Sequence, residues 1–151
     1  MTRSPRPRDR FGRPLARDSG VPVEPDPEPL PPDQSLDLAQ SLLEDGRAFR
    51  AHEVLEAIWK HDDTETKDMW RGLAQLAVGV THAQRGNAAG AVALLRRSAD
   101  TLSPWAGQTP HSVEVDAVRL WALRSAQAIE ASGGLEPTAA VSDLPRLSGG
   151  G

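Results

Sequence analysis

Two stretches of the chain place titratable and amide side chains within segments that have the residue pattern of core helices. Five such side chains and one tryptophan form a candidate ligand-binding set: His52, Glu53, Glu56, Trp59, Gln75 and His82. Moving polar groups of this kind out of water lowers stability unless each one gains a hydrogen-bond partner. The pattern therefore predicts a polar cluster, whose role is either structural or functional.

Helical geometry indicates which of these side chains meet. His52 and Glu56 are four residues apart, so they are neighbours on one helix face. Gln75 and His82 are seven residues apart, which places them on one edge of a later helix, beside a strip of small residues. This strip consists of Gly72, Gly79 and Ala83. If the strip packs against the helix that carries His52, the two polar pairs come together.

The cluster has a structural and a chemical interpretation. In the structural one, which we favour, His52 and Glu56 form a charged pair. His82 is then a core histidine that is bonded to Gln75 or to a backbone carbonyl. In the chemical one, His52, Glu56 and His82 are three metal ligands with an open coordination position. Glu53 then serves as the general base of a hydrolase. Neither interpretation identifies a cofactor or establishes a catalytic residue.

Three motifs of the chain together resemble a known family. The first is an aromatic-x-x-His-Glu-x-x-Glu-x-x-Trp pattern that begins at Phe49 and ends at Trp59. The second is Gly-Leu-x-Gln-Leu-Ala over residues 72–77, and the third is His-x-x-x-Gly-Asn-x-x-Gly-Ala over residues 82–91. Over about residues 38–102 the chain is similar to the family catalogued as domain of unknown function 309.

This resemblance implies a compact all-α fold and no established activity. The polar positions of the family pattern fall on four residues of this chain: His52, Glu53, Gln75 and His82. Within the second motif, the small Ala74 replaces a residue that is usually bulky. The replacement affects only the expected local packing.

The rest of the sequence predicts an all-α fold, because Ala, Leu, Arg and Glu recur at helical spacing and no run alternates strictly. We expect five helices: one from Asp33 or Ser35 to Gly46, one over Arg47–Lys60, one from Thr64 or Thr66 to Gly86, one capped by Asn87 and ending near Leu102, and one capped by Ser112 and ending near Ala131. An irregular loop over residues 103–111 precedes the last helix.

An internal repeat supports a bundle of paired helical hairpins. One set of small and apolar residues recurs forty positions later: Gly46, Ala48, Ala51 and Leu55 correspond to Gly86, Ala88, Ala91 and Leu95. Each set describes a helix that ends on glycine and a second helix that packs close to it, as in tetratricopeptide-like hairpins. Two copies are fewer than a stacked solenoid needs, so we expect a single compact bundle.

Both ends of the chain are predicted to be disordered tails. Nine of the thirteen prolines lie before Gln34, in a segment that is first rich in arginine and then acidic. Residues 133–151 are rich in glycine and include two more prolines. Neither segment contains enough apolar surface to offset the chain entropy lost on folding. We therefore expect a disordered tail over residues 1–34, a helical domain over residues 35–132 and a second tail over residues 133–151.

Composition excludes several classes of function. The chain has no cysteine, which excludes disulfides and thiolate sites. No run approaches the apolar length of a membrane span, and the arginine-rich start lacks the apolar segment of a signal peptide. A net charge of −4 argues against a nucleic-acid surface on the helical core. We expect a soluble, cytoplasmic protein that has no membrane partner; the oligomeric state is left open.

Two functions are carried forward. The first is a helical binding or interaction module, whose polar groove takes a small molecule or a peptide. The groove would be lined by four side chains of the candidate set: His52, Glu56, Gln75 and His82. The second is a small metal-dependent or acid/base hydrolase that uses the same cluster. The sequence does not establish whether the protein is an enzyme.

Overall fold

The computed structural model describes residues 7–133, 144, 146 and 147. This part of the chain contains five α-helices: α1 (Pro32–Glu44), α2 (Ala48–His61), α3 (Lys67–Gln84), α4 (Ala88–Leu102) and α5 (Val115–Ala131). Two single-turn 3-10 helices, η1 (Ser103–Trp105) and η2 (Pro110–Ser112), connect α4 to α5. The described residues form no β-strand beyond one isolated bridge between Arg8 and Pro14. The prediction of an all-α fold with five helices is therefore confirmed.

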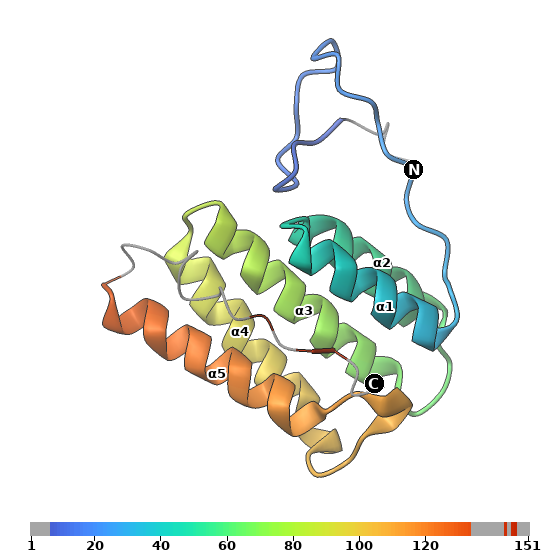
Figure 1. Cartoon of the computed structure of the whole chain (residues 1–151), viewed down its shortest axis with the longest axis vertical. Coiled ribbons are helices and arrows are strands. Elements are labelled where there is room, and N and C mark those ends of the chain that lie inside the picture. The colour runs from blue at the N-terminus through green and yellow to red at the C-terminus, as the bar shows by residue number, and fades with distance from the viewer. Residues whose placement is uncertain (1–6, 134–143, 145, 148–151) are drawn as a thin grey trace.

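The helices form a linear array in which each packs mainly against the next one along the chain. Figure 1 shows this order, from α1 and α2 on one side of the molecule to α5 on the other. The inner helix α3 has extensive contacts with both α2 and α4, and eleven of its residues are buried. Within the described residues, no helix is both long and apolar enough to cross a membrane.

The turn after α1 and the turn after α3 have the same geometry. Gly46 and Gly86 adopt left-handed φ values of 76° and 78°, which glycine reaches without the steric penalty of a side chain. In each turn the residue after the glycine donates its N–H to a carbonyl five residues earlier: Arg47 to Leu42 and Asn87 to His82, both at 2.8 Å. These bonds are those of a Schellman C-cap. The sequence repeat thus corresponds to a repeated helix end.

The predicted caps are only partly correct. Asn87 caps α4 as expected, because its side-chain oxygen accepts the Gly90 N–H at 3.0 Å. The helix α1 begins at Pro32 without a side-chain cap, and the Ser35 hydroxyl instead donates to the Leu30 carbonyl at 3.0 Å. Ser112 does not cap α5 either, because that helix begins at Val115. The latter two expectations were wrong.

The strip of small residues on α3 faces α4 rather than α2. A Cβ atom added at Gly72 would lie 2.8 Å from Leu102 side-chain atoms, and one added at Gly79 would lie 2.9 Å from Leu95 Cγ. This close approach also lets the buried Ser98 hydroxyl donate to the Gly72 carbonyl at 2.8 Å. The arrangement in which the strip would bring Gln75 and His82 beside His52 is therefore not the one found.

Described residues outside the predicted domain contact the helices. Leu147 is completely buried in the core, and its backbone N–H donates to the Gln40 side-chain oxygen at 2.7 Å. Residues 7–31 contain no helix, and several of them bind to α2 and to the helix ends, as described below. Residues 1–6, 134–143, 145 and 148–151 lie outside the described part of the chain. Disorder of the two tails stays a prediction.

Candidate functional site

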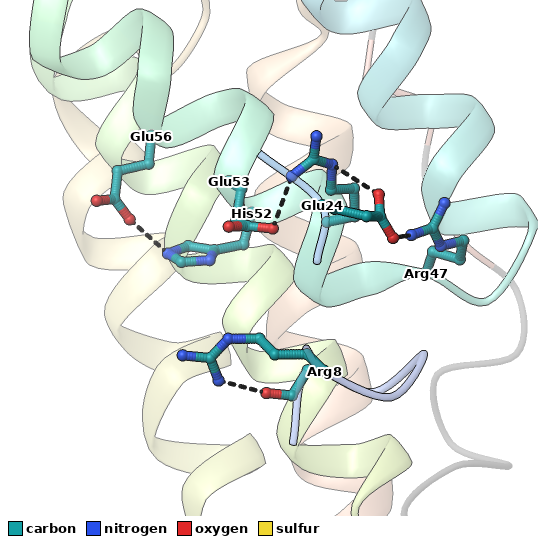
Figure 2. A network of polar contacts seen from close by, with 8 residues as sticks. Arg8, Glu24, Arg47, His52, Glu53 and Glu56 are labelled. Carbon is teal, nitrogen blue, oxygen red and sulfur yellow. Dashed lines mark hydrogen bonds and ion pairs between the residues drawn. The ribbon is translucent and has the colours of Figure 1, made fainter. Parts of the chain in front are cut away.

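Three side chains on consecutive turns of α2 form a chain of ion pairs. His52 Nε2 lies 2.7 Å from one Glu56 carboxylate oxygen, and the Lys60 ammonium lies 2.7 Å from the other. The spacing of four residues between members places all three on one helix face. Figure 2 shows the His52–Glu56 contact. The pairing of His52 with Glu56 that the sequence predicts is therefore present.

The two carboxylates on this face have pKa values shifted in opposite directions. Burial acts to raise the pKa of Glu56, but the bonds and charges of Lys60 and His52 outweigh burial and lower it. Burial raises the pKa of Glu53 above its usual value, although its ion pair with Arg50 at 3.2 Å acts against this shift. Glu56 is thus favoured in its charged form, whereas folding disfavours the charge on Glu53.

These opposite shifts predict opposite effects of neutralising the two carboxylates. A carboxylate with a lowered pKa adds stability above its unfolded pKa and loses it as the pH falls through the folded value. Glu56→Gln should therefore reduce the free energy of unfolding at pH 7 by a few tenths to about 1 kcal/mol, the range for partly exposed pairs. That loss should shrink towards zero as the pH falls below the lowered pKa of Glu56.

Glu53→Gln on the same helix is the matched control. Because burial raises the pKa of Glu53, its charged form detracts from stability at neutral pH, so this variant should be neutral or slightly stabilising there. Urea unfolding of the two variants between pH 3 and pH 8 measures both effects. Equal losses of unfolding free energy for the two variants at pH 7 would contradict the opposite pKa shifts of Glu53 and Glu56.

His82 is bound at the C-terminal end of α3 by Asn87, which also caps α4. Its Nδ1 atom lies 3.1 Å from the amide nitrogen of Asn87, and its ring would contact a Cβ atom at Gly90. Burial, followed by the nearby Arg85 charge, lowers the pKa of His82, so the neutral ring accepts a hydrogen bond from the Asn87 amide. The predicted bond from His82 to Gln75 or to a backbone carbonyl is replaced by this one.

Three members of the candidate set have a buried polar atom that no described residue satisfies. These atoms are His52 Nδ1, Trp59 Nε1 and Gln75 Oε1. A buried polar atom without a partner reduces stability, and such atoms are few in native proteins. Each of these three atoms therefore carries a desolvation cost that no described contact offsets.

The predicted metal ligands are not assembled as a set. In the described part of the chain, no three His, Cys, Asp or Glu side chains are placed to hold a metal ion. His52 and Glu56 are in contact on α2, whereas His82 is bound to Asn87 at the end of α3. The structure thus brings together two of the three ligands that the chemical interpretation needs.

Residues 7–15, which we name the N-terminal loop, fold into a closed turn within the predicted tail. The Asp9 carboxylate accepts hydrogen bonds from the backbone N–H groups of Phe11 and Arg13, both at 2.9 Å. The last residue of the loop donates its N–H to the carbonyl of the first at 2.8 Å. The sequence Asp-Arg-Phe-Gly at positions 9–12 carries the signal for this turn, because aspartate and glycine are typical turn residues.

The N-terminal loop binds the C-terminal ends of two helices. The Arg10 guanidinium donates to the Asp45 carbonyl at 2.6 Å, and the Arg13 guanidinium donates to the Arg85 carbonyl at 3.2 Å. Asp45 and Arg85 are the C-cap residues of α1 and α3. Carbonyls at helix C-termini lack partners within the helix and carry partial negative charge, which attracts cations. The loop therefore caps both copies of the repeated helix end.

The same loop covers Phe49 at the start of α2. The guanidinium groups of Arg8 and Arg85 lie 4.9 Å and 5.8 Å from the centre of the Phe49 ring. Gly12 lies so close to this ring that an added Cβ atom would be 2.2 Å from Phe49 Cγ. The ring of His52 is 5.4 Å from that of Phe49. The loop therefore adjoins the predicted polar cluster, and Figure 2 shows Arg8 beside it.

Glu24 makes a second contact between the segment before α1 and the start of α2. Its carboxylate is paired with the guanidinium groups of both Arg47 and Arg50, and it lies 3.4 Å from Arg50 Nε. Figure 2 shows this bridge. The segment that precedes α1 thus binds α2 through cationic and anionic side chains alike.

Comparison with known proteins finds a family match over part of the chain and no activity. A protein of Bacillus subtilis (strain 168) named "Uncharacterized protein YpuF" is 45% identical over 51 residues, which are 33% of this chain and 29% of that protein. The chain therefore matches less than a third of the length of this relative. No solved structure matches the chain. The family model described as "Domain of unknown function (DUF309)" matches residues 36–94. The resemblance to this family is thereby confirmed over residues 36–94, which are less than half of the chain.

Proposed function

We propose that this chain is a helical interaction module that binds an arginine-containing, turn-forming peptide segment. The binding surface consists of the C-terminal ends of α1 and α3 together with Phe49 and His52 of α2, and we name it the helix-end surface. In this chain the N-terminal loop occupies it. The observation that carries the proposal is the paired capping of the Asp45 and Arg85 carbonyls by arginines three residues apart.

Each contact of the loop depends on a property that another peptide could share. Guanidinium groups donate strongly to carbonyl oxygens, and a cation over an aromatic face contributes about 0.5–1 kcal/mol at exposed sites. Arg85 also donates from Nε to the Phe11 carbonyl at 2.9 Å, so the surface recognises the backbone of the turn. Recognition of backbone and guanidinium groups together favours a peptide over a small molecule.

The polar cluster extends the helix-end surface along α2. His52 follows Phe49 by one helical turn, and the Glu53 and Glu56 carboxylates follow His52 on the same stretch of helix. The Glu56 carboxylate, whose lowered pKa favours its charged form, suits a basic peptide that continues beyond the turn. The geometry favours this module over the hydrolase, because the Glu53 carboxylate, which would act as the base, is bound to Arg50.

The test uses a substitution that displaces the loop from the full chain. Gly12→Val places a branched side chain where φ is +79° and where Cβ would overlap the Phe49 ring, so the loop should leave the surface. A fluorescent peptide of residues 7–15 should then bind the variant. We expect its affinity to be at least about tenfold higher than for the unaltered chain, because a tethered loop competes at an effective concentration near the millimolar range.

Two controls separate this surface from general charge attraction. A peptide with Asp9→Ala keeps every arginine but loses the acceptor that closes the turn, and it should bind several-fold more weakly. Phe49→Ala in the Gly12→Val background should abolish binding of the original peptide. The proposal fails if the peptide binds the variant and the unaltered chain equally, or if Phe49→Ala has no effect on fluorescence anisotropy.

A further inference from the structure

A pocket of about 260 Å³ lies at the end of α2 that is remote from the helix-end surface. Ile58, His61 and Asp62 line it from α2 and the residue that follows, and Trp70 lines it from α3. A cavity of ~150 Å³ is large enough to hold benzene. The volume therefore admits a molecule with one ring and a short substituent.

Most of the residues that line the pocket are apolar or aromatic. Pro29, Leu30 and Pro32, from the segment that leads into α1, close one side. On another side the rings of Trp70 and His111 lie 5.3 Å apart, at an angle of 37°. The His111 ring is also fixed by a contact of 3.2 Å between its Nε2 atom and the Thr66 hydroxyl. The Trp70 side chain is fully buried, whereas the His111 ring is exposed. Together the two rings form an aromatic wall of the pocket.

The backbone at His111 is also unusual. His111 and Ser112 have φ values of 53° and 64°, a left-handed conformation that is uncommon for residues other than glycine. Consecutive residues of this kind are strained, and such strain concentrates at binding and active sites. In this protein the left-handed backbone at His111 places its side chain beside the Trp70 ring.

The charged group among the lining residues is the carboxylate of Asp62, and the lining includes no lysine or arginine. Asp62 accepts hydrogen bonds from the Thr64 hydroxyl at 2.6 Å, from the Thr64 N–H at 2.8 Å and from the Thr66 hydroxyl at 3.0 Å. Burial acts to raise the pKa of Asp62, but these bonds outweigh burial and lower it, so the group is an anion at neutral pH. The ammonium group of Lys67, just beyond the turn, is already bound to the carbonyls of Trp59 and Asp62, at 2.6 and 3.1 Å.

We propose that this pocket binds a small organic amine in its cationic form, with the ammonium group towards Asp62 and an apolar ring against the wall of Pro29, Leu30 and Pro32. His61 is an exposed lining residue, and its Nδ1 atom is engaged with the Ala57 carbonyl at 2.9 Å. Its remaining ring nitrogen is therefore free to accept a hydrogen bond from the amine. The site does not depend on the helix-end surface, which lies at the opposite end of α2.

The experiment compares two probes of the same shape on the unaltered full chain. Benzylamine is a cation at neutral pH and benzyl alcohol is its neutral counterpart, and both are titrated into ¹⁵N-labelled protein. We expect benzylamine to shift the side-chain N–H resonance of Trp70, identified with a Trp70→Phe variant, and to bind about tenfold more tightly than the alcohol. Equal affinities, no binding of either probe, or shifts that spare Trp70 would overturn the proposal.

A pair of neighbouring variants tests the role of the carboxylate. Asp62→Asn keeps an acceptor for Thr64 but removes the charge, and it should abolish the preference for the amine. Asp63→Asn removes the same charge from an exposed neighbour that does not line the pocket, and it should leave the preference intact. A preference that survives Asp62→Asn, or that is lost in Asp63→Asn, would also overturn the proposal. Gly12→Val should leave amine binding unchanged, which keeps the outcome separate from that of the peptide experiment.

Discussion

Replacing Leu147 with alanine should lower the free energy of unfolding by about 2–5 kcal/mol, the range for a leucine truncated inside a packed core. Leu147 is completely buried among residues of the helical core, although the sequence places it in a tail. The truncation removes apolar contacts and leaves a cavity, and both effects act in the same direction. Urea unfolding monitored by circular dichroism measures the change.

Arg146→Ala is the matched control for this prediction. Arg146 is the exposed neighbour of Leu147, so its replacement should change stability by less than about 0.5 kcal/mol. If both variants unfold like the original chain, the segment around Leu147 adds nothing to the domain. The boundary predicted at residue 132 would then describe the folded unit correctly.

The second large effect is expected at the contact between α3 and α4. Gly79→Leu should destabilise the protein by about 1–3 kcal/mol or more, because added side-chain atoms in a packed contact force the helices apart. The obstacle includes backbone as well as side chain, since a Cβ atom at Gly79 would lie 3.2 Å from the Leu95 nitrogen and 2.9 Å from Leu95 Cγ. The side chain alone could rotate away, whereas the backbone of α4 has to move.

The control for Gly79→Leu is a leucine on the exposed face of α4. Ala93 is exposed, so Ala93→Leu adds similar atoms without a clash and should change stability little. Thermal unfolding should separate the two variants by at least several degrees, given about 2–4 °C per kcal/mol for chains of this size. A Gly79→Leu protein that melts with the Ala93→Leu protein would contradict the packing of α3 against α4.

Features that depend on residues close in the sequence were predicted well. The five helices follow from their periodicity, and the Asn87 cap and the two glycine turns follow from local backbone chemistry. The contact between His52 and Glu56 likewise follows from a spacing of four residues on one helix. Each of these features depends only on residues a few positions apart in the sequence, so the local sequence pattern is sufficient to predict it.

Features that depend on which surfaces meet were not predicted. The helix α3 is buried on most of its sides, so its apolar pattern does not show which face meets α2 and which meets α4. The predicted meeting of Gln75 and His82 with His52 depended on this choice. Docking of the N-terminal loop was missed for another reason. Arg10 and Arg13 bind backbone carbonyls, and because every residue has such a carbonyl, the residue types do not indicate which ones accept.

The linear order of the helices has a consequence for how the chain folds. When each helix packs on its neighbour along the chain, most contacts join residues that are close in sequence. Helical bundles with such local contacts fold within microseconds to milliseconds, because little loop entropy is lost before contacts form. The contacts of Phe11 with Arg85 and of Leu147 with Gln40 span 74 and 107 residues. Both ends of the chain are therefore expected to dock last, onto helices that have already formed.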